Sequence, residues 1–262
     1  MTSIEFVDVA AARSAPGVRL VVSGLVPSPW SEAAKGLFRI ANVPVLGVRR
    51  GRGPEAAEIT AWAGVDNVPV VFHGAEPVRS NWAAITTLAA RLGPPGAVLP
   101  EELGARAEAM GLLHEIAGED GIGWNARLAM IDASLASGGK RGFPLPIAQF
   151  LAARYGHSPE AVARGRARVE HQLRALADRL RARTAAGHAY LGGDRVSALD
   201  VYLATFLTPL GPITTDDCPG LAPVLREAFG LAHEALGALV SGELHAHRRM
   251  VFERHLAWPI AL

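Results

Sequence analysis

The sequence predicts an α/β domain followed by an all-helical domain. From Val18 to about Leu92, short apolar runs alternate with segments of helical periodicity, an order typical of strands and helices that share one sheet. A Gly/Pro cluster at residues 93–96 follows directly and is typical of a domain boundary. Beyond Leu99 the periodicity is helical throughout, which predicts a second core built from helices alone.

Composition narrows the class of protein. The chain has 262 residues, half of them apolar, enough for one large domain or two modest domains, each with its own core. A net charge of +1 argues against nucleic acid or an anionic membrane surface as the main partner. The single cysteine, Cys218, excludes an internal disulfide and a cysteine metal cage. No apolar run reaches the roughly 20 residues of a membrane span, and Met1–Ala12 lacks the pattern of a secretion signal. We therefore expect a cytoplasmic protein.

The first domain is expected to span residues 19–93. We interpret residues 1–18 as an N-terminal extension, in which the alternating run Ile4–Val9 is compatible with a short edge strand. The domain itself should contain strands at Leu20–Val22, Pro44–Val48 and Val68–Phe72, a further strand near Val78, and helices at Ser28–Ile40, Pro54–Trp62 and Asn81–Leu92.

The second domain is expected to span residues 101–262, after a linker at 94–100. Residues 138–157 are interpreted as an irregular segment because Gly and Pro are frequent around Phe143–Pro146. This segment either shapes a pocket or forms a surface loop, and the sequence does not separate the two. The helices should lie at Glu101–Ala117, Trp124–Ala136, Ser158–Arg183, Val196–Thr208, Leu221–Val240 and Leu244–His255.

Ser28 is the first candidate functional residue. It follows the first apolar run and precedes Pro29, an arrangement that predicts Ser28 as the N-cap of a helix with proline at its first position. Glu32 lies in the first turn and favours the same helix start. A hydroxyl at a helix N-terminus can hold an anion or can simply cap the helix, and the local sequence permits both roles.

Pro69 is the second informative position. A proline inside an apolar strand loses a ladder hydrogen bond, so it needs a structural reason. A trans proline on an edge strand is one reason. A cis Val68–Pro69 bond is the other, because it turns the main chain outward toward a ligand.

Val196–Val201 carries a complete helix-start pattern. Ser197 is expected to cap the helix, and Asp200 to reach back from the third helical position. We interpret Asp200 as structural because a carboxylate in a capping box is already engaged.

These three features together resemble the cytosolic glutathione transferase superfamily, over about residues 19–255. Ser28–Ser31 resembles the catalytic turn of the serine- and cysteine-using classes, of omega-, zeta- or beta-like type. Asn67–Val70 is similar to the strand that carries the family's cis proline. Tyr190–Tyr202 resembles the helix-cap motif of the second domain. The resemblance implies a thioredoxin-like domain, then an all-helical domain, usually paired as a homodimer.

The resemblance also implies a chemistry, the attack of a glutathione thiolate on a small hydrophobic electrophile. Ser28 would donate its hydroxyl to the sulfur, with Ser31 as the alternative donor. A hydrogen bond to a charged group is worth about 1.5–3 kcal/mol, which lowers a thiol pKa by roughly one to two units. Serine cannot form a mixed disulfide, so a conjugating, lyase or isomerase activity is expected, with glutathione as co-substrate and no metal.

Glutathione binding is the part of the resemblance that this sequence meets least well. The family pairs the peptide with the main chain before the cis proline and holds the γ-glutamyl end with an acidic residue followed by serine. One alignment puts Arg79-Ser80 at that place, the other Asn81-Trp82. Neither supplies the acid, so Glu76 or a group from a partner subunit is the expected substitute. The candidate glutathione contacts are Val68, Pro69, Arg79, Ser80 and Asn81.

The electrophile is expected between the domains, against Trp30, His114 and Trp124. A metal site at His245 and His247 is not expected, because residues two apart do not share a helical face. A second hypothesis is a non-catalytic binding or assembly protein of the same fold, which the missing acid favours. A third is the use of another small thiol in place of glutathione.

Overall fold

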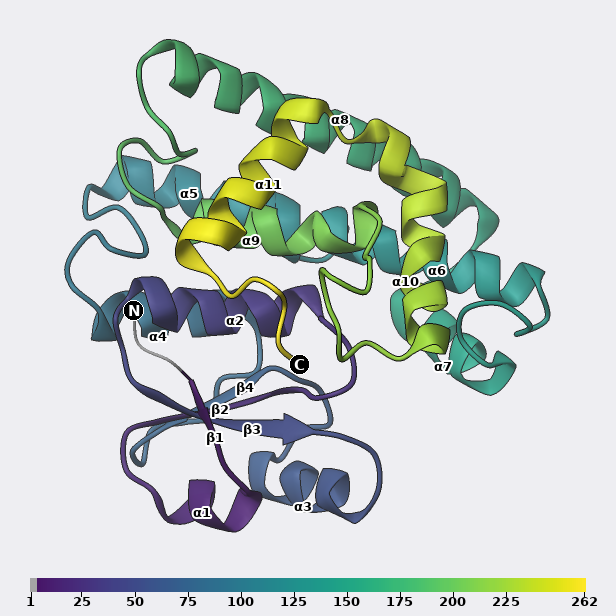
Figure 1. Ribbon diagram of the computed structural model, residues 1–262, viewed down its shortest axis with the longest axis horizontal. Coiled ribbons are helices and arrows are strands. Elements are labelled where there is room, and N and C mark those ends of the chain that lie inside the picture. Colours follow the sequence, from purple (N-terminus) through teal and green to yellow (C-terminus); the bar gives the residue numbers. More distant parts are fainter. Residues whose placement is uncertain (1–3) are drawn as a thin grey trace.

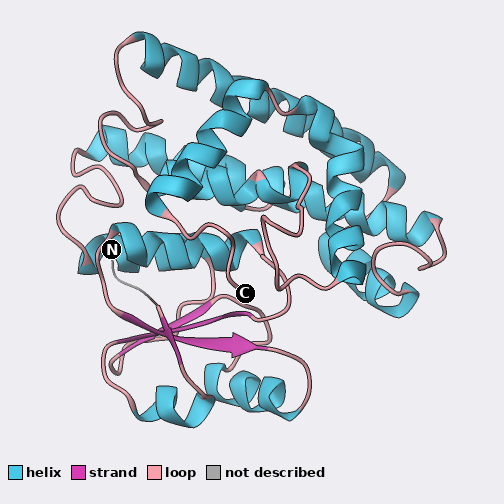
Figure 2. Cartoon of the chain, viewed as in Figure 1, coloured by secondary structure: helices cyan, strands magenta, loops and turns pink. Residues whose placement is uncertain are grey.

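A computed structural model describes residues 4–262 as a small sheet domain joined to a larger domain of helices (Figure 1). The strands are confined to one end of the molecule (Figure 2). The expected order, a thioredoxin-like domain followed by an all-helical one, is confirmed.

The sheet has four strands, β1 (Glu5–Phe6), β2 (Val18–Ser23), β3 (Val45–Arg50) and β4 (Val70–His73). Their spatial order is β1-β3-β2-β4. β1 and β2 pair with β3 in parallel, and β4 pairs with β2 in antiparallel orientation. The strand expected near Val78 is reduced to a single bridge between Val71 and Arg79.

Residues 4–17, the described part of the expected N-terminal extension, pack on this domain, since β1 pairs with β3. The edge strand β1 is shorter than the alternation of Ile4–Val9 suggested, and helix α1 (Val9–Ser14) follows it. This helix was not expected. Asp8 caps it by accepting a hydrogen bond from the Ala11 N–H at 2.7 Å, a local signal inside a segment too short for clear helical periodicity.

Helices cover both faces of the sheet. α2 (Pro29–Ile40) and α4 (Trp82–Leu92) lie on the face toward the helical domain, whereas α1 and α3 (Pro54–Ala63) cover the opposite face (Figure 1). Strand alternation explains the division. In β2, Leu20 and Val22 join the large core shared with the helical domain, and Val21 joins the smaller core beneath.

The helix at the centre of the helical domain is α9 (Ala198–Phe206), whose nine residues are all buried. α9 packs on α2, α5 and α11 and so ties the two domains together. The other helices are α5 (Leu103–Ala117), α6 (Ile122–Ala136), α7 (Leu145–Tyr155), α8 (Pro159–Ala185), α10 (Pro223–Leu236) and α11 (Gly242–His255), with short 3-10 turns at Thr208–Leu210 and Gly237–Leu239.

The interpretation of residues 138–157 as irregular is wrong for most of that segment. Helix α7 occupies Leu145–Tyr155. Pro144 is its N-cap and Pro146 lies in its first turn, where a missing N–H costs nothing because these groups have no partner within the helix. Gly156, in the left-handed conformation at φ 63°, ends it. The prolines that looked like breakers therefore begin a helix.

The capping box at the start of α9 is present as expected. Asp200 Oδ2 accepts hydrogen bonds from the Ser197 N–H at 2.9 Å and the Ser197 hydroxyl at 2.8 Å. Asp200 Oδ1 accepts one from the Leu191 N–H at 2.8 Å and lies 3.0 Å from His247 Nε2. With no exposed surface, Asp200 is a structural residue.

Candidate functional site

A cleft of about 660 Å³ opens between the two domains. It is bounded by the end of β2, the start of α2, the turn before β4, the start of α4, and parts of α5, α6 and α7. The structure brings together most of the residues that the sequence singled out: Ser28, Trp30, Val68, Pro69, Ser80, Asn81 and Trp124.

Ser28 lies at the N-terminus of α2, as expected, but its side chain does not cap the helix. Its N–H donates to the Val26 carbonyl at 2.7 Å and its carbonyl accepts from the Glu32 N–H at 2.9 Å. Within residues 4–262 its hydroxyl makes no hydrogen bond, although the residue is only 9% exposed. The hydroxyl is thus free to bind a group in the cleft, close to the positive end of the helix dipole.

Ser31, the alternative donor, is differently placed. It is fully buried and does not line the cleft. Its Oγ accepts a hydrogen bond from the Ser23 N–H at 3.1 Å, which links α2 to the end of β2. This geometry supports a structural role for Ser31.

The Val68–Pro69 peptide bond is cis, and both residues line the cleft. The main-chain N–H and carbonyl of Val68 have no hydrogen-bond partner within the described part of the chain. Asn67 secures the turn by donating from Nδ2 to the Ser80 carbonyl at 2.8 Å. An unpaired main-chain edge next to a strand is a suitable surface for an extended peptide.

The start of α4 forms the next part of the cleft. Asn81 is the N-cap, and its Oδ1 accepts from the Ala84 N–H at 2.9 Å. The N–H groups of the first turn point out of the helix and favour anions. Ser80 and Asn81 both line the cleft, whereas Arg79 does not.

Arg79 instead belongs to an ion cluster centred on Glu76. The Glu76 carboxylate binds Arg79 Nη2 and Arg91 Nη2, each at 2.5 Å, and lies 2.7 Å from His73 Nδ1. These hydrogen bonds, that of Arg91 foremost, lower the pKa of Glu76 from 4.5 to about 2. Glu76 is outside the cleft lining and already bound, so it is not the substitute for the missing acid.

We expect Glu76→Gln to lower the free energy of unfolding at neutral pH but not near pH 2. Because the folded-state pKa of Glu76 is lowered from 4.5 to about 2, the ionised carboxylate stabilises the fold above pH 4.5 and this contribution disappears as the pH falls toward 2. Denaturant titrations of wild type and variant should therefore differ at pH 7 and converge near pH 2. Glu101→Gln, at an exposed residue, is the control; a constant difference across this range contradicts the prediction.

Aromatic side chains form the wall of the cleft on the helical side. Trp30 donates from Nε1 to the Ala117 carbonyl at 3.1 Å and meets Phe206 edge to face at 4.8 Å. Trp124 packs on Tyr155 with ring centroids 4.5 Å apart. His114 does not line the cleft; its ring packs against Trp82, which does.

Several cleft residues were not found from the sequence. Tyr155 and Arg154 lie on α7, the helix that the prolines concealed. Arg50 ends β3 and donates to the Asp66 carbonyl at 2.7 Å, and Arg154 lies 3.6 Å from the Asp66 carboxylate. Arg127 stacks over Phe143 at 5.4 Å and has no carboxylate partner within residues 4–262. No local motif marks these side chains.

Among residues 4–262, no cluster of His, Cys, Asp and Glu has the arrangement of a metal site. Across the same residues, none of the helices combines the length and the apolar character needed to cross a bilayer.

The comparisons with known proteins define the class of fold. Residues 159–227 match the family model described as the C-terminal domain of glutathione S-transferase. No curated protein matches the chain.

Solved structures extend the likeness over both domains. A glutathione S-transferase from Xanthobacter autotrophicus is 15% identical with a TM-score of 0.56, covering 94% of this chain and 98% of the other. One from Methylobacterium radiotolerans, in complex with glutathione sulfonate, is 14% identical with a TM-score of 0.52 and coverages of 90% and 91%. Apo human glutathione-S-transferase T1-1 is 18% identical, with a TM-score of 0.51 and coverages of 94% and 93%. The chain has the glutathione transferase fold.

Proposed function

We propose that this protein is a glutathione transferase-like enzyme in which Ser28 stabilises the thiolate of glutathione for attack on a small hydrophobic electrophile. The observation that carries the proposal is the Ser28 hydroxyl, which faces the cleft at the start of α2 without a hydrogen-bond partner within residues 4–262. The fold adds support, since one neighbour of the same fold was solved with glutathione sulfonate.

The chemical task is to ionise a thiol. A free thiol has a pKa of about 8.5, and only its thiolate is a good nucleophile. Donation of the Ser28 hydroxyl to the sulfur, together with the helix dipole, favours the thiolate, and the thiol proton leaves to water. The sulfur then forms a bond to the electrophilic carbon as the leaving group departs with its electron pair.

The cleft offers matching contacts for the rest of glutathione. The unpaired main chain of Val68 suits the cysteinyl peptide unit, and the first turn of α4 at Ser80 and Asn81 suits the γ-glutamyl carboxylate. Three arginines and two carboxylates line the cleft: Arg50, Arg127, Arg154, Asp66 and Glu119. This excess of positive charge suits a peptide with two carboxylates and one ammonium group.

Asn81→Asp should improve glutathione binding. It places a carboxylate at one of the two positions where the resemblance expects an acid, and aspartate caps a helix as well as asparagine does. A partly exposed ion pair is worth about 0.2–1 kcal/mol, so the KM for glutathione should fall by up to about fivefold with kcat unchanged. Steady-state kinetics at varied glutathione measure this; a raised KM would place the γ-glutamyl ammonium elsewhere.

The electrophile is expected to lie against Trp30, Trp124 and Tyr155, which give the cleft its aromatic wall. A flat apolar substrate would stack there and exclude water from the sulfur. The resemblance further implies a homodimer in the cytoplasm, and a mass measurement in solution tests the dimer.

The proposal is tested by binding and turnover together. Wild type should be retained on immobilised glutathione, be released by free glutathione, and conjugate a generic aryl halide. Retention without turnover across a broad set of electrophiles would establish the alternative, a non-catalytic binding protein of this fold. Turnover with another small thiol but not with glutathione would show that the cleft serves a different co-substrate.

A further inference from the structure

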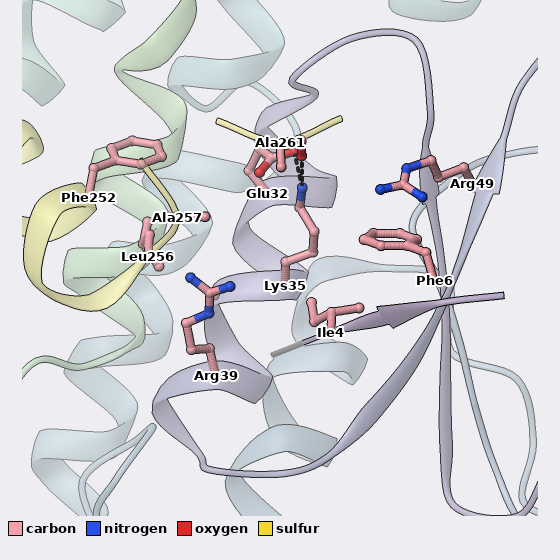
Figure 3. Close-up of a pocket in the computed structure, with 11 residues that line it drawn as sticks. Ile4, Phe6, Glu32, Lys35, Arg39, Arg49, Phe252, Leu256, Ala257 and Ala261 are labelled. Carbon is pink, nitrogen blue, oxygen red and sulfur yellow. Dashed lines mark hydrogen bonds and ion pairs between the residues drawn. The ribbon is translucent and has the colours of Figure 1, made fainter. Parts of the chain in front are cut away.

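A second cavity, here called the α2 pocket, lies beside the middle of α2 and shares no lining residue with the cleft. It has a volume of about 240 Å³. It is enclosed by β1, α2, β3 and the segment that follows α11 (Figure 3).

One face of α2 supplies the charged groups of this pocket. Glu32, Lys35 and Arg39 are three or four residues apart and so lie above one another on the helix. Lys35 Nζ has two partners, since it lies 2.8 Å from Glu32 Oε1 and donates to the Ala261 carbonyl at 2.8 Å (Figure 3). Lys35 is therefore the ion-pair partner of Glu32, the one acidic side chain among the described residues that line the pocket.

Arg49, on β3, is also engaged. Its Nε donates to the main-chain oxygen of Leu262 at 2.6 Å, and its guanidinium stacks over the ring of Phe6 at 3.5 Å (Figure 3). Lys35 and Arg49 therefore both have hydrogen-bond partners within the described part of the chain.

Arg39 is the exception. It is partly buried, and within residues 4–262 no hydrogen bond or ion pair reaches its guanidinium. Burial lowers the pKa of Arg39, and the nearby Glu32 carboxylate offsets this effect only in part. Its side chain extends toward the segment around Leu256 (Figure 3). A desolvated guanidinium with a fixed donor fork is well suited to a carboxylate.

The remaining walls are apolar. Ile4 and Phe6 lie on one side, and Phe252 and Leu256 on the other. The volume is below the roughly 300–1,000 Å³ typical of pockets for drug-sized ligands, which limits the occupant to about one ring with a short chain.

We propose that the α2 pocket binds a small amphipathic carboxylate, with its ring between the apolar walls and its carboxylate paired with Arg39. Such a ligand would join β1, α2 and the C-terminal segment, three parts of the chain that otherwise meet here through few polar bonds. The site is independent of glutathione chemistry in the cleft.

Phenylacetate is the probe and benzyl alcohol its uncharged counterpart. Calorimetric titration of the full chain should show phenylacetate binding with one site per chain, and benzyl alcohol binding at least about tenfold more weakly, as expected when a charge-assisted hydrogen bond is lost. Arg39→Gln should weaken phenylacetate by a similar factor. Arg52→Gln, at an exposed arginine, is the matched control and should bind like wild type.

A second variant separates pocket occupancy from charge. Ala257→Leu keeps every charged group and fills part of the cavity, so it should abolish phenylacetate binding, whereas Arg39→Gln only weakens it. Arg127→Gln, in the cleft, should leave binding unchanged. Any of four results would overturn the proposal: wild type fails to bind phenylacetate, wild type binds both probes equally well, Arg39→Gln retains the wild-type affinity, or Arg127→Gln loses binding.

Discussion

Ser28→Ala is expected to lower kcat/KM for the conjugation of glutathione by about tenfold to a hundredfold. The lost interaction is a hydrogen bond to a charged sulfur, worth about 1.5–3 kcal/mol, and about 1.4 kcal/mol corresponds to a factor of ten in rate. The fold should be unaffected, because the hydroxyl of Ser28 caps nothing in the structure. Steady-state kinetics and thermal unfolding measure the two effects.

A second serine at a helix start provides the matched control. Unlike Ser28, Ser158 caps its helix, α8, with its side chain, since its Oγ accepts a hydrogen bond from the Ala161 N–H at 3.1 Å. Ser158→Ala should therefore cost about 1 kcal/mol of stability and leave turnover unchanged, the reverse of Ser28→Ala. If Ser28→Ala retains the wild-type rate, Ser28 is not the group that stabilises the thiolate.

Asp200→Ala is expected to destabilise the protein by about 3–5 kcal/mol, the usual cost of breaking a fully buried charged network. The variant removes the acceptor of the Leu191 and Ser197 donors and leaves His247 without its partner. Because α9 is the helix against which α2 packs, the loss should affect both domains. The free energy of unfolding in denaturant measures it.

Asp194→Ala is the matched control. The side chain of Asp194 is 81% exposed and, among residues 4–262, pairs only with His188, so this change should cost no more than about 1 kcal/mol. A similarly small loss for Asp200→Ala would show that the capping box does not hold the domains together.

Local signals accounted for much of the fold and part of the site. The starts of α2, α8 and α9 were predicted because proline and capping residues act over one turn of chain. Ser28, Pro69 and Asn81 were found for the same reason: each lies directly before a helix or a strand, where such residues have few alternative roles.

The elements that were missed are those whose local signals mislead. α7 begins with two prolines that resemble a break, and α1 is only six residues long. Because α7 was not predicted, Arg154 and Tyr155, which line one side of the cleft, were not predicted as site residues either.

Contacts between residues that are distant in the sequence could not be predicted either. The partnership of Glu76 with Arg91, fifteen residues away, could not be inferred from spacing, so Glu76 remained a candidate ligand that the structure removes. The position of Ser28 at a helix start favoured it over Ser31, but the burial of Ser31 depends on its contact with the Ser23 N–H of β2, which no local signal predicts.

The pKa of the thiol of bound glutathione tests the central claim most directly. Ultraviolet absorbance of the thiolate, followed against pH for glutathione bound to wild type and to Ser28→Ala, gives this value without any electrophile. The thiol pKa should lie one to two units below the value of about 8.5 for a free thiol in wild type and return toward that value in Ser28→Ala. An unshifted pKa in wild type, or an equal shift in both proteins, would contradict the role proposed for Ser28.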